Sequence, residues 1–310
     1  MVHERTRIRT LFEYSAIRGV LGAVRILPPR LAFWLTDRMG DLAYHLDREH
    51  RLVAQKNLAA VFGGAAEDQE HRRRARMVFR HFMRVAAEFA LLPRLIEKRG
   101  LEDVIQIEGR QNVEQALSLG KGVIVFTGHV GNWEVVAAAA EPLGLKLHSV
   151  GRTMDNHLLD RFLTRERTRY ARSVIPKEGG LREIVRVLRS GEAVAMLLDQ
   201  HAGRSGIDVD FLGRPASTFR AAAELSVRFG LPLLGGFGVR VDDSPRFKLT
   251  FDPPLLPVPG ADKNQEVRRL TQAASDAIAE RVMSHPEQWN WLHRRWRKKK
   301  KRKSKQESRL

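Results

Sequence analysis

The chain has 310 residues, of which 43% are hydrophobic, enough for one large domain or two small ones with a substantial core. It contains no cysteine, which excludes disulfides, thiolate nucleophiles and zinc–cysteine sites. The formal net charge is +18, and residues 294–310 contribute +10 of it through eleven Lys/Arg and one Glu. We expect this basic tail to be disordered and to contact an anionic membrane surface or an acidic acyl carrier protein. Nucleic acid, or solvent alone, would suit the same composition.

Residues 1–98 are predicted to form an N-terminal helical, membrane-associating region. An apolar stripe of helical spacing runs from Leu11 to Leu27 and is broken by two prolines, and further helical patterns follow at 31–44, 47–61 and 67–88. Charged residues interrupt the most apolar stretch, so helices lying on a membrane surface are favoured over a span, which needs ~20 apolar residues. No signal peptide is evident. The arginines at 72–76, 80 and 84 are expected to face solvent or lie near acidic headgroups.

From about residue 102 the pattern changes to strands alternating with helices. Strands are predicted at 104–108, 122–127, 147–150, 193–198, 232–239 and 246–251, and helices at 111–119, 132–143, 155–172, 178–190, 217–229 and 263–284. This alternation predicts an α/β domain over residues 99–293, with a mostly parallel central sheet flanked by helices. Such sheets bind ligands at the carboxyl ends of their strands. His129 and Asp199 each follow a strand directly, which places both at that edge.

The most informative segment is 122–134, Gly-Val-Ile-Val-Phe-Thr-Gly-His-Val-Gly-Asn-Trp-Glu, in which Glu134 follows His129 by five residues. On one continuous helix two such residues are rotated by ~140° and cannot face one site. They converge only if His129 lies in the loop after the strand and Glu134 enters the first turn of the next helix. The sequence therefore predicts a strand-to-helix corner at this point.

Gly128 and Gly131 give the backbone freedom that this corner needs, and Asn132 can cap the helix. At such a corner His129 can act as a general base on a hydroxyl. We expect Glu134 to accept a hydrogen bond from its other ring nitrogen, fixing the tautomer and stabilising the imidazolium. The alternative is a partly buried histidine in a loop without a catalytic role.

Residues 122–134 and three later segments together resemble a known protein family. The later segments are 152–156 (Arg-Thr-Met-Asp-Asn) with Arg167 beyond it, 198–200 (Leu-Asp-Gln) leading to 209–211 and Thr218, and 286–296 (Pro-Glu-Gln-Trp-Asn-Trp-Leu-His-Arg-Arg-Trp). In this order, over almost the whole chain, they resemble the bacterial lipid A (Kdo2-lipid A) lauroyl/myristoyl acyltransferases of the lysophospholipid acyltransferase superfamily.

The resemblance implies a glycerolipid-acyltransferase-like fold and a transfer without metal or cofactor. The donor would be an acyl-acyl carrier protein and the acceptor a hydroxyl on a lipid A precursor or similar glycolipid. It also implies a location at the cytoplasmic face of the bacterial inner membrane, with peripheral or monotopic attachment. Members of the family often carry a true N-terminal anchor, which residues 11–35 do not match.

The resemblance also marks Arg152 and Asn156 as site residues. Chemically, Arg152 can hold a phosphate or polarise the thioester carbonyl, or it can form a salt bridge with Asp155. Arg167 can contact an acceptor phosphate or lie on the surface. These three are predicted substrate-binding residues.

Asp199, Gln200 and Thr218 are also predicted substrate-binding residues. Asp199, with Gln200 beside it, ends an apolar strand, where it can orient a sugar hydroxyl, bind a basic partner or cap the following turn. Thr218 is expected to open a helix, either as an anion site or as a cap. The tryptophans of 286–296 can form an interfacial belt or close the core, and for Trp291 the core is favoured.

Sequence features also bear on functions other than acyl transfer to a lipid A precursor. An acyltransferase using acyl-CoA, or acting on a phosphatidylinositol mannoside, aminolipid or lysophospholipid, stays within the same chemistry. A nucleic-acid-binding protein would need a folded reading module, and no such signature is present, so nucleic acid is not an expected partner. The spacing around His129 does not suit a metal hydrolase. Because there is no Gly-x-Ser-x-Gly elbow, direct attack on the thioester is expected rather than an acyl-enzyme.

Overall fold

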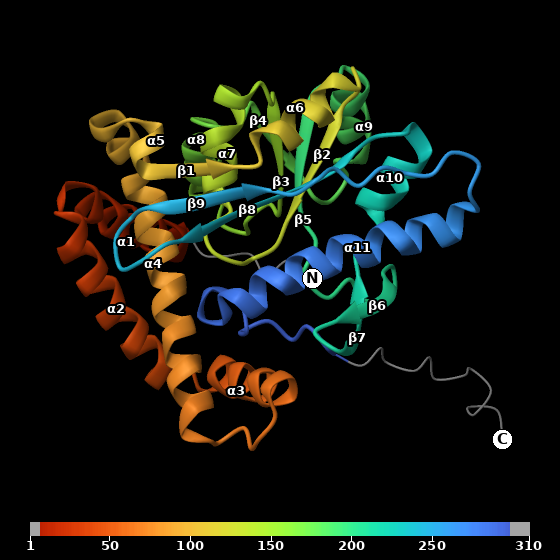
Figure 1. Cartoon of the computed structure of the whole chain (residues 1–310). Helices are drawn as coiled ribbons and strands as arrows, with labels where there is room; N and C mark the ends of the chain where they lie inside the picture. The colour runs from red at the N-terminus through yellow and green to blue at the C-terminus, as the bar shows by residue number, and fades with distance from the viewer. Residues whose placement is uncertain (1–6, 298–310) are drawn as a thin grey trace.

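The computed structural model describes residues 7–297 and begins with four helices, α1 (Arg7–Ile26), α2 (Pro29–Leu46), α3 (Arg48–Phe62) and α4 (Gln69–Arg99). Pro28 and Pro29 separate α1 from α2, because proline suits the first turn of a helix but not its interior. In Figure 1 α2 lies on the outer side of α4, away from the sheet. Helix α1 also packs against Phe162 and Glu166, through Tyr14 and Arg25. The helical content predicted for residues 1–98 is therefore present. The basic stretch 298–310 lies outside the described residues.

A seven-stranded sheet forms the centre of the molecule. Its order is β1-β9-β8-β2-β5-β3-β4, and every pairing is parallel except that between β8 and β9. The strands are β1 (Ile105–Glu108), β2 (Val123–Thr127), β3 (Leu147–Gly151), β4 (Ser173–Pro176), β5 (Ala193–Leu197), β8 (Leu233–Arg240) and β9 (Phe247–Phe251). The predicted fold class, α/β with a mostly parallel sheet, is confirmed.

Helices cover both faces of this sheet, and the central strand β2 is buried along its whole length. Ile124 and Phe126 join one apolar cluster, while Val123 and Val125 join the other. This explains why the strand is a continuous apolar run rather than an alternating one. The remaining helices are α5 (Leu101–Val104), α6 (Arg110–Ser118), α7 (Glu134–Ala140), η1 (Glu141–Leu143), α8 (His157–Arg167), α9 (Leu181–Arg189), α10 (Ala221–Phe229), α11 (Lys263–Ser284) and η2 (Pro286–Gln288).

A hairpin of β6 (Ile207–Phe211) and β7 (Arg214–Thr218) stands apart from the main sheet. The prediction of a helix from residue 217 is wrong at its start, because the chain stays extended to Thr218 and α10 begins at Ala221. A two-residue turn, Leu212 (φ 56°) and Gly213 (φ 74°), closes the hairpin. Two consecutive positive φ values match the right-handed twist of paired strands.

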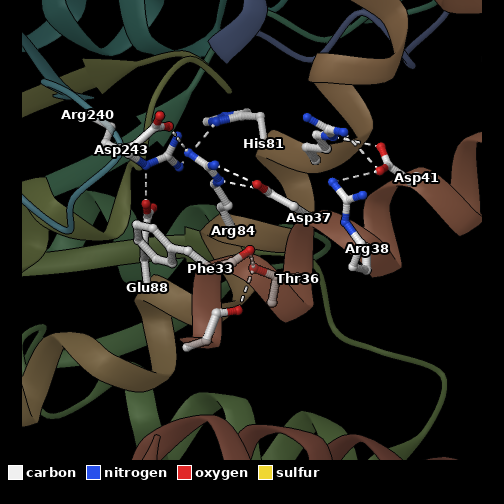
Figure 2. A network of polar contacts seen from close by, with 12 residues as sticks. Phe33, Thr36, Asp37, Arg38, Asp41, His81, Arg84, Glu88, Arg240 and Asp243 are labelled. Atoms are coloured by element: carbon white, nitrogen blue, oxygen red, sulfur yellow. Dashed lines mark hydrogen bonds and ion pairs between the residues drawn. The ribbon is translucent and has the colours of Figure 1, made fainter. Parts of the chain in front are cut away.

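Of the α4 arginines expected to face solvent or acidic headgroups, Arg72 and Arg73 are exposed. Arg76, Arg80 and Arg84 instead form ion pairs with α2. Arg80 contacts Asp41 at 2.6 Å, and Arg84 contacts Asp37 at 2.6 Å. Arg84 also reaches Asp243, beyond the end of β8, at 2.6 Å. Figure 2 shows this row of contacts running between the two helices. The α2–α4 interface is thus charged at its edge and apolar at its centre, where Phe33 is buried.

Candidate active site

His129 lies in the loop between β2 and α7, and the tight packing of this loop accounts for its glycines. A Cβ on Gly128 would come within 2.8 Å of Ile278 Cγ2. Gly131 has φ +61°, and a Cβ there would lie 2.1 Å from the Gly238 carbonyl oxygen. Neither position can take a larger residue without moving its neighbours. The predicted strand-to-helix corner is present, and Glu134 is the first residue of α7.

Asp199, in the loop after β5, is the carboxylate that contacts His129. Its Oδ1 lies 2.7 Å from His129 Nδ1, and its Oδ2 accepts a hydrogen bond from the His129 backbone N–H at 2.6 Å. A third donor, the Trp289 indole N–H, reaches Oδ2 at 2.8 Å. The Asp199 side chain is 1% exposed and that of His129 is 18% exposed. Asp199 is therefore enclosed, while the imidazole keeps one side open.

The electrostatics of this pair favour an ionised Asp199. Burial opposes ionisation, but the His129 charge and the hydrogen bonds from His129 and Trp289 outweigh it and lower the Asp199 pKa to about 2. With Nδ1–H donating to this carboxylate, His129 Nε2 carries the lone pair that can accept a proton. Gln200 Nε2 lies 3.4 Å from His129 Nε2. The arrangement can abstract a proton and stabilise the resulting imidazolium.

Glu134 does not orient His129, and the prediction of a hydrogen bond between these two side chains is wrong. Its carboxylate accepts from Arg167 Nε at 2.9 Å, so it faces α8. The physical reason lies in strand pairing. β2 pairs with β5 in a register that sets Thr127 opposite Leu197, so the loops that follow them leave the sheet side by side. The carboxylate that reaches the imidazole therefore comes from the neighbouring strand.

Asn132, predicted as the helix cap, lies one residue before the N-cap Trp133, but its side chain still contacts the start of α7. Its Oδ1 accepts from the Glu134 N–H at 3.1 Å, and its own N–H donates to the Gly238 carbonyl oxygen at 2.7 Å. Its side-chain Nδ2 donates to Glu88 of α4 at 3.0 Å. Glu88 in turn forms a buried ion pair with Arg240, drawn in Figure 2. The His129 loop is thus anchored to α4 and to β8.

The predicted site residues in the segment after β3 lie in two different environments. Asn156 is 2% exposed and caps α8, accepting from Leu158 N at 3.1 Å and Leu159 N at 3.2 Å. Its Nδ2 donates to the Thr10 carbonyl oxygen of α1 at 2.9 Å. Arg152 instead lines an open hollow together with Arg167. Asn156 thus joins α8 to α1 and also lines a neighbouring hollow with Arg152, while the two arginines can meet an anionic group.

Thr218 does not open a helix. It ends β7, and its hydroxyl accepts from Arg295 Nη2 at 2.5 Å. Arg295 also donates to the Ser217 carbonyl oxygen at 2.7 Å and to the Gln200 carbonyl oxygen at 3.3 Å. It is fully buried, and burial lowers its pKa to about 10 although Asp199 acts in the opposite direction. The expected boundary between domain and tail at 293/294 therefore does not match the packing of residues 294–297.

Trp289 and Arg295 are the residues of the site that sequence reasoning did not assign. The tryptophans of 286–296 close the core, as favoured for Trp291, rather than forming an interfacial belt. Only the density of aromatic and basic residues in that segment signalled a special role. Across residues 7–297 no group of three or more His, Asp or Glu side chains is placed to hold a metal ion.

The profile of the bacterial lipid A biosynthesis acyltransferases matches residues 1–298 of this chain. The chain belongs to this family. The resemblance carried by the four motifs is thereby confirmed.

The chain is also similar to individual acyltransferases, over different shares of its length. The lipid A biosynthesis palmitoleoyltransferase of Escherichia coli is 27% identical over 90% of this chain and 89% of its own length. The phosphatidylinositol mannoside acyltransferase of Mycobacterium tuberculosis is also 27% identical, but the match spans 61% of this chain and 59% of that relative. Among solved structures, the 1-acyl-sn-glycerophosphate acyltransferase of Thermotoga maritima covers 82% of this chain and 99% of its own, with a TM-score of 0.38 and 16% identity.

This family member exposes large apolar side chains on its first two helices. On α2 they recur at helical spacing along the side opposite the buried Phe33 and Tyr44. Within the described part of the chain, no helix combines the length and apolar character that crossing a membrane requires. The exposed apolar residues are Ile8, Leu11, Phe12, Ile17, Val20 and Ile26 on α1, and Leu31, Trp34, Leu35, Met39, Leu42 and Leu46 on α2.

Proposed function

We propose that the chain is an O-acyltransferase that moves a fatty acyl group from an acyl thioester to a hydroxyl of a lipid A-type glycolipid. The observation that carries this proposal is the buried Asp199 bound to Nδ1 of His129, whose imidazole remains partly exposed at the carboxyl edge of the sheet. Family membership supplies the acyl-transfer class and the type of acceptor.

The reaction follows from these atoms. His129 Nε2 takes the proton of the acceptor hydroxyl while the oxygen attacks the thioester carbonyl carbon. The C–S bond breaks as the ester forms, and the departing thiolate takes the proton back from the imidazolium. Asp199 holds the productive tautomer and stabilises the transient positive charge. No protein nucleophile takes part in this scheme.

Glu134 acts differently from the role first expected of it. We assign it to holding Arg167, which lines the same hollow as Arg152. Two guanidinium groups suit a phosphate or another anionic group on the acceptor. Gln200, beside the open ring nitrogen, is placed to contact the hydroxyl or the thioester oxygen. Asn156 and Thr218 support these elements from the interior.

For the donor we propose acyl-acyl carrier protein, since the +18 net charge of the chain favours an acidic protein partner. Acyl-CoA is the alternative. For the acceptor, the lipid A relative aligns over 90% of the chain, against 61% for the phosphatidylinositol mannoside relative. That difference favours a lipid A precursor.

The exposed apolar side chains of α1 and α2 support attachment to a membrane surface. Interfacial helices bury such a face among headgroups and upper acyl chains. Arg18 and Arg30 are exposed on the same two helices and can contact anionic headgroups. We therefore propose peripheral or monotopic attachment at the cytoplasmic face of the bacterial inner membrane, the side that holds acyl carrier protein.

The test is acyl transfer in detergent from labelled acyl-acyl carrier protein to a lipid A precursor, with acyl-CoA and a phosphatidylinositol mannoside in parallel. Transfer by the wild type that is lost in His129→Ala supports the reaction and the base. An active His129→Ala would overturn the mechanism. Inactivity of the wild type with both donors on the lipid A precursor would overturn the acceptor, and activity on the mannoside would replace it.

A further inference from the structure

The segment Pro286–Arg297, which we call the C-terminal strap, crosses both loops that carry the catalytic pair. Against the His129 loop, Gly131 N–H donates to the Gln288 carbonyl oxygen at 2.8 Å and Asn290 N–H donates to the His129 carbonyl oxygen at 3.1 Å. Against the Asp199 loop, the His201 N–H donates to His293 Nε2 at 2.9 Å. The strap therefore adds a second connection between two loops that strand pairing and the Asp199–His129 contacts already hold side by side.

Trp289 lies at the centre of the strap and touches the pair directly. It is 1% exposed and forms an isolated β-bridge with Val130, next to His129. Its indole N–H donates to Asp199 Oδ2 at 2.8 Å, the oxygen that does not contact the imidazole. With Oδ2 held by Trp289 and by the His129 backbone, Oδ1 is aimed at His129 Nδ1. The indole thus opposes rotation of the carboxylate.

The charged and titratable groups around Asp199 and His129 come from the same two loops and the strap. They are His201 from the Asp199 loop, and His293 and Arg295 from the strap. Burial lowers the His293 pKa to about 4, so this side chain is neutral near pH 7 and accepts the His201 N–H. Arg295 is a buried cation, and its attraction to Asp199 partly offsets the lowering of its pKa by burial.

We propose that Trp289 is a positioning residue for acyl transfer, acting through Asp199 to fix the orientation of the His129 imidazole. The proposal rests on the proposed function, because it assigns His129 as the base. A hydrogen bond to a buried carboxylate is among the stronger ones in proteins, so its loss should be measurable in turnover. Trp289 itself touches no substrate in this role.

The strap offers a matched control. Trp291 is fully buried beside Trp289, with ring centroids 4.7 Å apart, and its indole N–H donates to the Pro286 carbonyl oxygen at 2.6 Å. Trp289→Phe and Trp291→Phe therefore each remove one buried indole and one hydrogen bond from the same segment. Only the first alters the environment of Asp199.

We expect Trp289→Phe to lower kcat about tenfold with little change in KM, and Trp291→Phe to change kcat by less than about threefold. The kcat profile of Trp289→Phe should also shift along the pH axis, whereas that of Trp291→Phe should not. A second measurement does not require turnover: the downfield proton resonance of the His129 Nδ1–H, assigned with Asp199→Asn, should move or broaden in Trp289→Phe alone.

Equal loss of kcat in the two variants, with an unchanged His129 resonance in both, would overturn the proposal and leave Trp289 as a packing residue. A wild type that transfers no acyl group would refute the proposed function instead. In that case the resonance still decides the point, since a shift in Trp289→Phe alone supports positioning of His129 and its absence refutes it.

Discussion

Two regions of the molecule break the usual rule of apolar inside and polar outside, and they do so in opposite ways. At the carboxyl edge of the sheet Asp199 and Arg295 are buried, and Asp199 has a hydrogen bond to each oxygen. On α1 and α2, by contrast, large apolar side chains such as Ile8 and Trp34 are exposed. Burying charge and exposing apolar surface both cost stability.

The two regions differ in whether the partners of their side chains lie inside the protein or outside it. The buried polar groups satisfy one another inside the protein, so that region can fix a geometry before substrate arrives. The exposed apolar face has no counterpart among the described residues, so it requires an external one. The first region is suited to chemistry and the second to placing that chemistry at a lipid surface. Separate variants should therefore disable each without the other.

The largest expected effect comes from His129→Ala. Removing the base should lower kcat by about 10³–10⁴-fold, while binding to lipid vesicles should remain at the wild-type level. Acyl-transfer rates in detergent and vesicle co-sedimentation measure the two quantities. A variant that lost both together would show that the two regions are not independent.

Asp199→Asn should come next, with a loss of about 10²–10³-fold in kcat. An asparagine offers an N–H₂ group where all three neighbours are donors, so it cannot hold the same tautomer of His129. Glu134→Gln is the informative companion, because Gln keeps a carbonyl oxygen for Arg167. We expect it to lower kcat by about tenfold or less. A larger loss of kcat in Glu134→Gln than in Asp199→Asn would instead support Glu134 as the carboxylate that orients His129.

The membrane face should respond to polar substitution without loss of chemistry. Phe12→Ser combined with Trp34→Ser should weaken vesicle binding by at least about tenfold, because each side chain loses ~1.5–3 kcal/mol of apolar burial on insertion. The rate in detergent should change by less than about twofold. Leu181→Ser with Val258→Ser, also exposed but on α9 and in the segment after β9, provides the control. Equal vesicle binding by both double variants would contradict a lipid-facing role.

The smallest effect expected is a pH dependence of stability arising from His293. Its folded-state pKa of about 4 lies below the ordinary value of ~6.5, so the unfolded chain takes up a proton that the folded one excludes. This contribution is complete above about pH 6.5 and is lost as the pH falls toward 4, by about 1 kcal/mol, because solvent screens the part of the side chain that stays exposed. Urea unfolding at pH 7 and pH 5 measures it. His293→Gln, which keeps an acceptor for His201 N–H, should flatten the difference.

The sequence predicted much of the scaffold because strong local patterns encode it. The apolar run 123–127, Gly131 and Asn132 predicted the corner that carries His129, and the structure has it. The partner of His129 was misassigned because spacing along the chain does not report which strands pair. Asp199 reaches His129 through the β2–β5 pairing.

The C-terminal strap was harder still to predict from sequence. A run of Arg, His and Trp indicates a solvated or interfacial surface, and no local pattern shows that Arg295 is enclosed by Thr218, Ser217 and Gln200. The β6–β7 hairpin was missed for a related reason. Its second strand contains Pro215 and Ser217, residues more typical of loops and helix starts.

The position of the strap along the chain also bears on how the site is made. Chains emerge and fold from the N-terminus, so the sheet, His129 and Asp199 are synthesised well before residues 286–297. Until Trp289 contacts Asp199, the Asp199 carboxylate lacks one of its three hydrogen bonds. The growing chain then holds His129 and Asp199 without the contact from the strap. If Trp289 positions the pair as proposed, acyl transfer begins only after residues 286–297 are made, when α1 and α2, which are made first, are already available to contact a lipid surface.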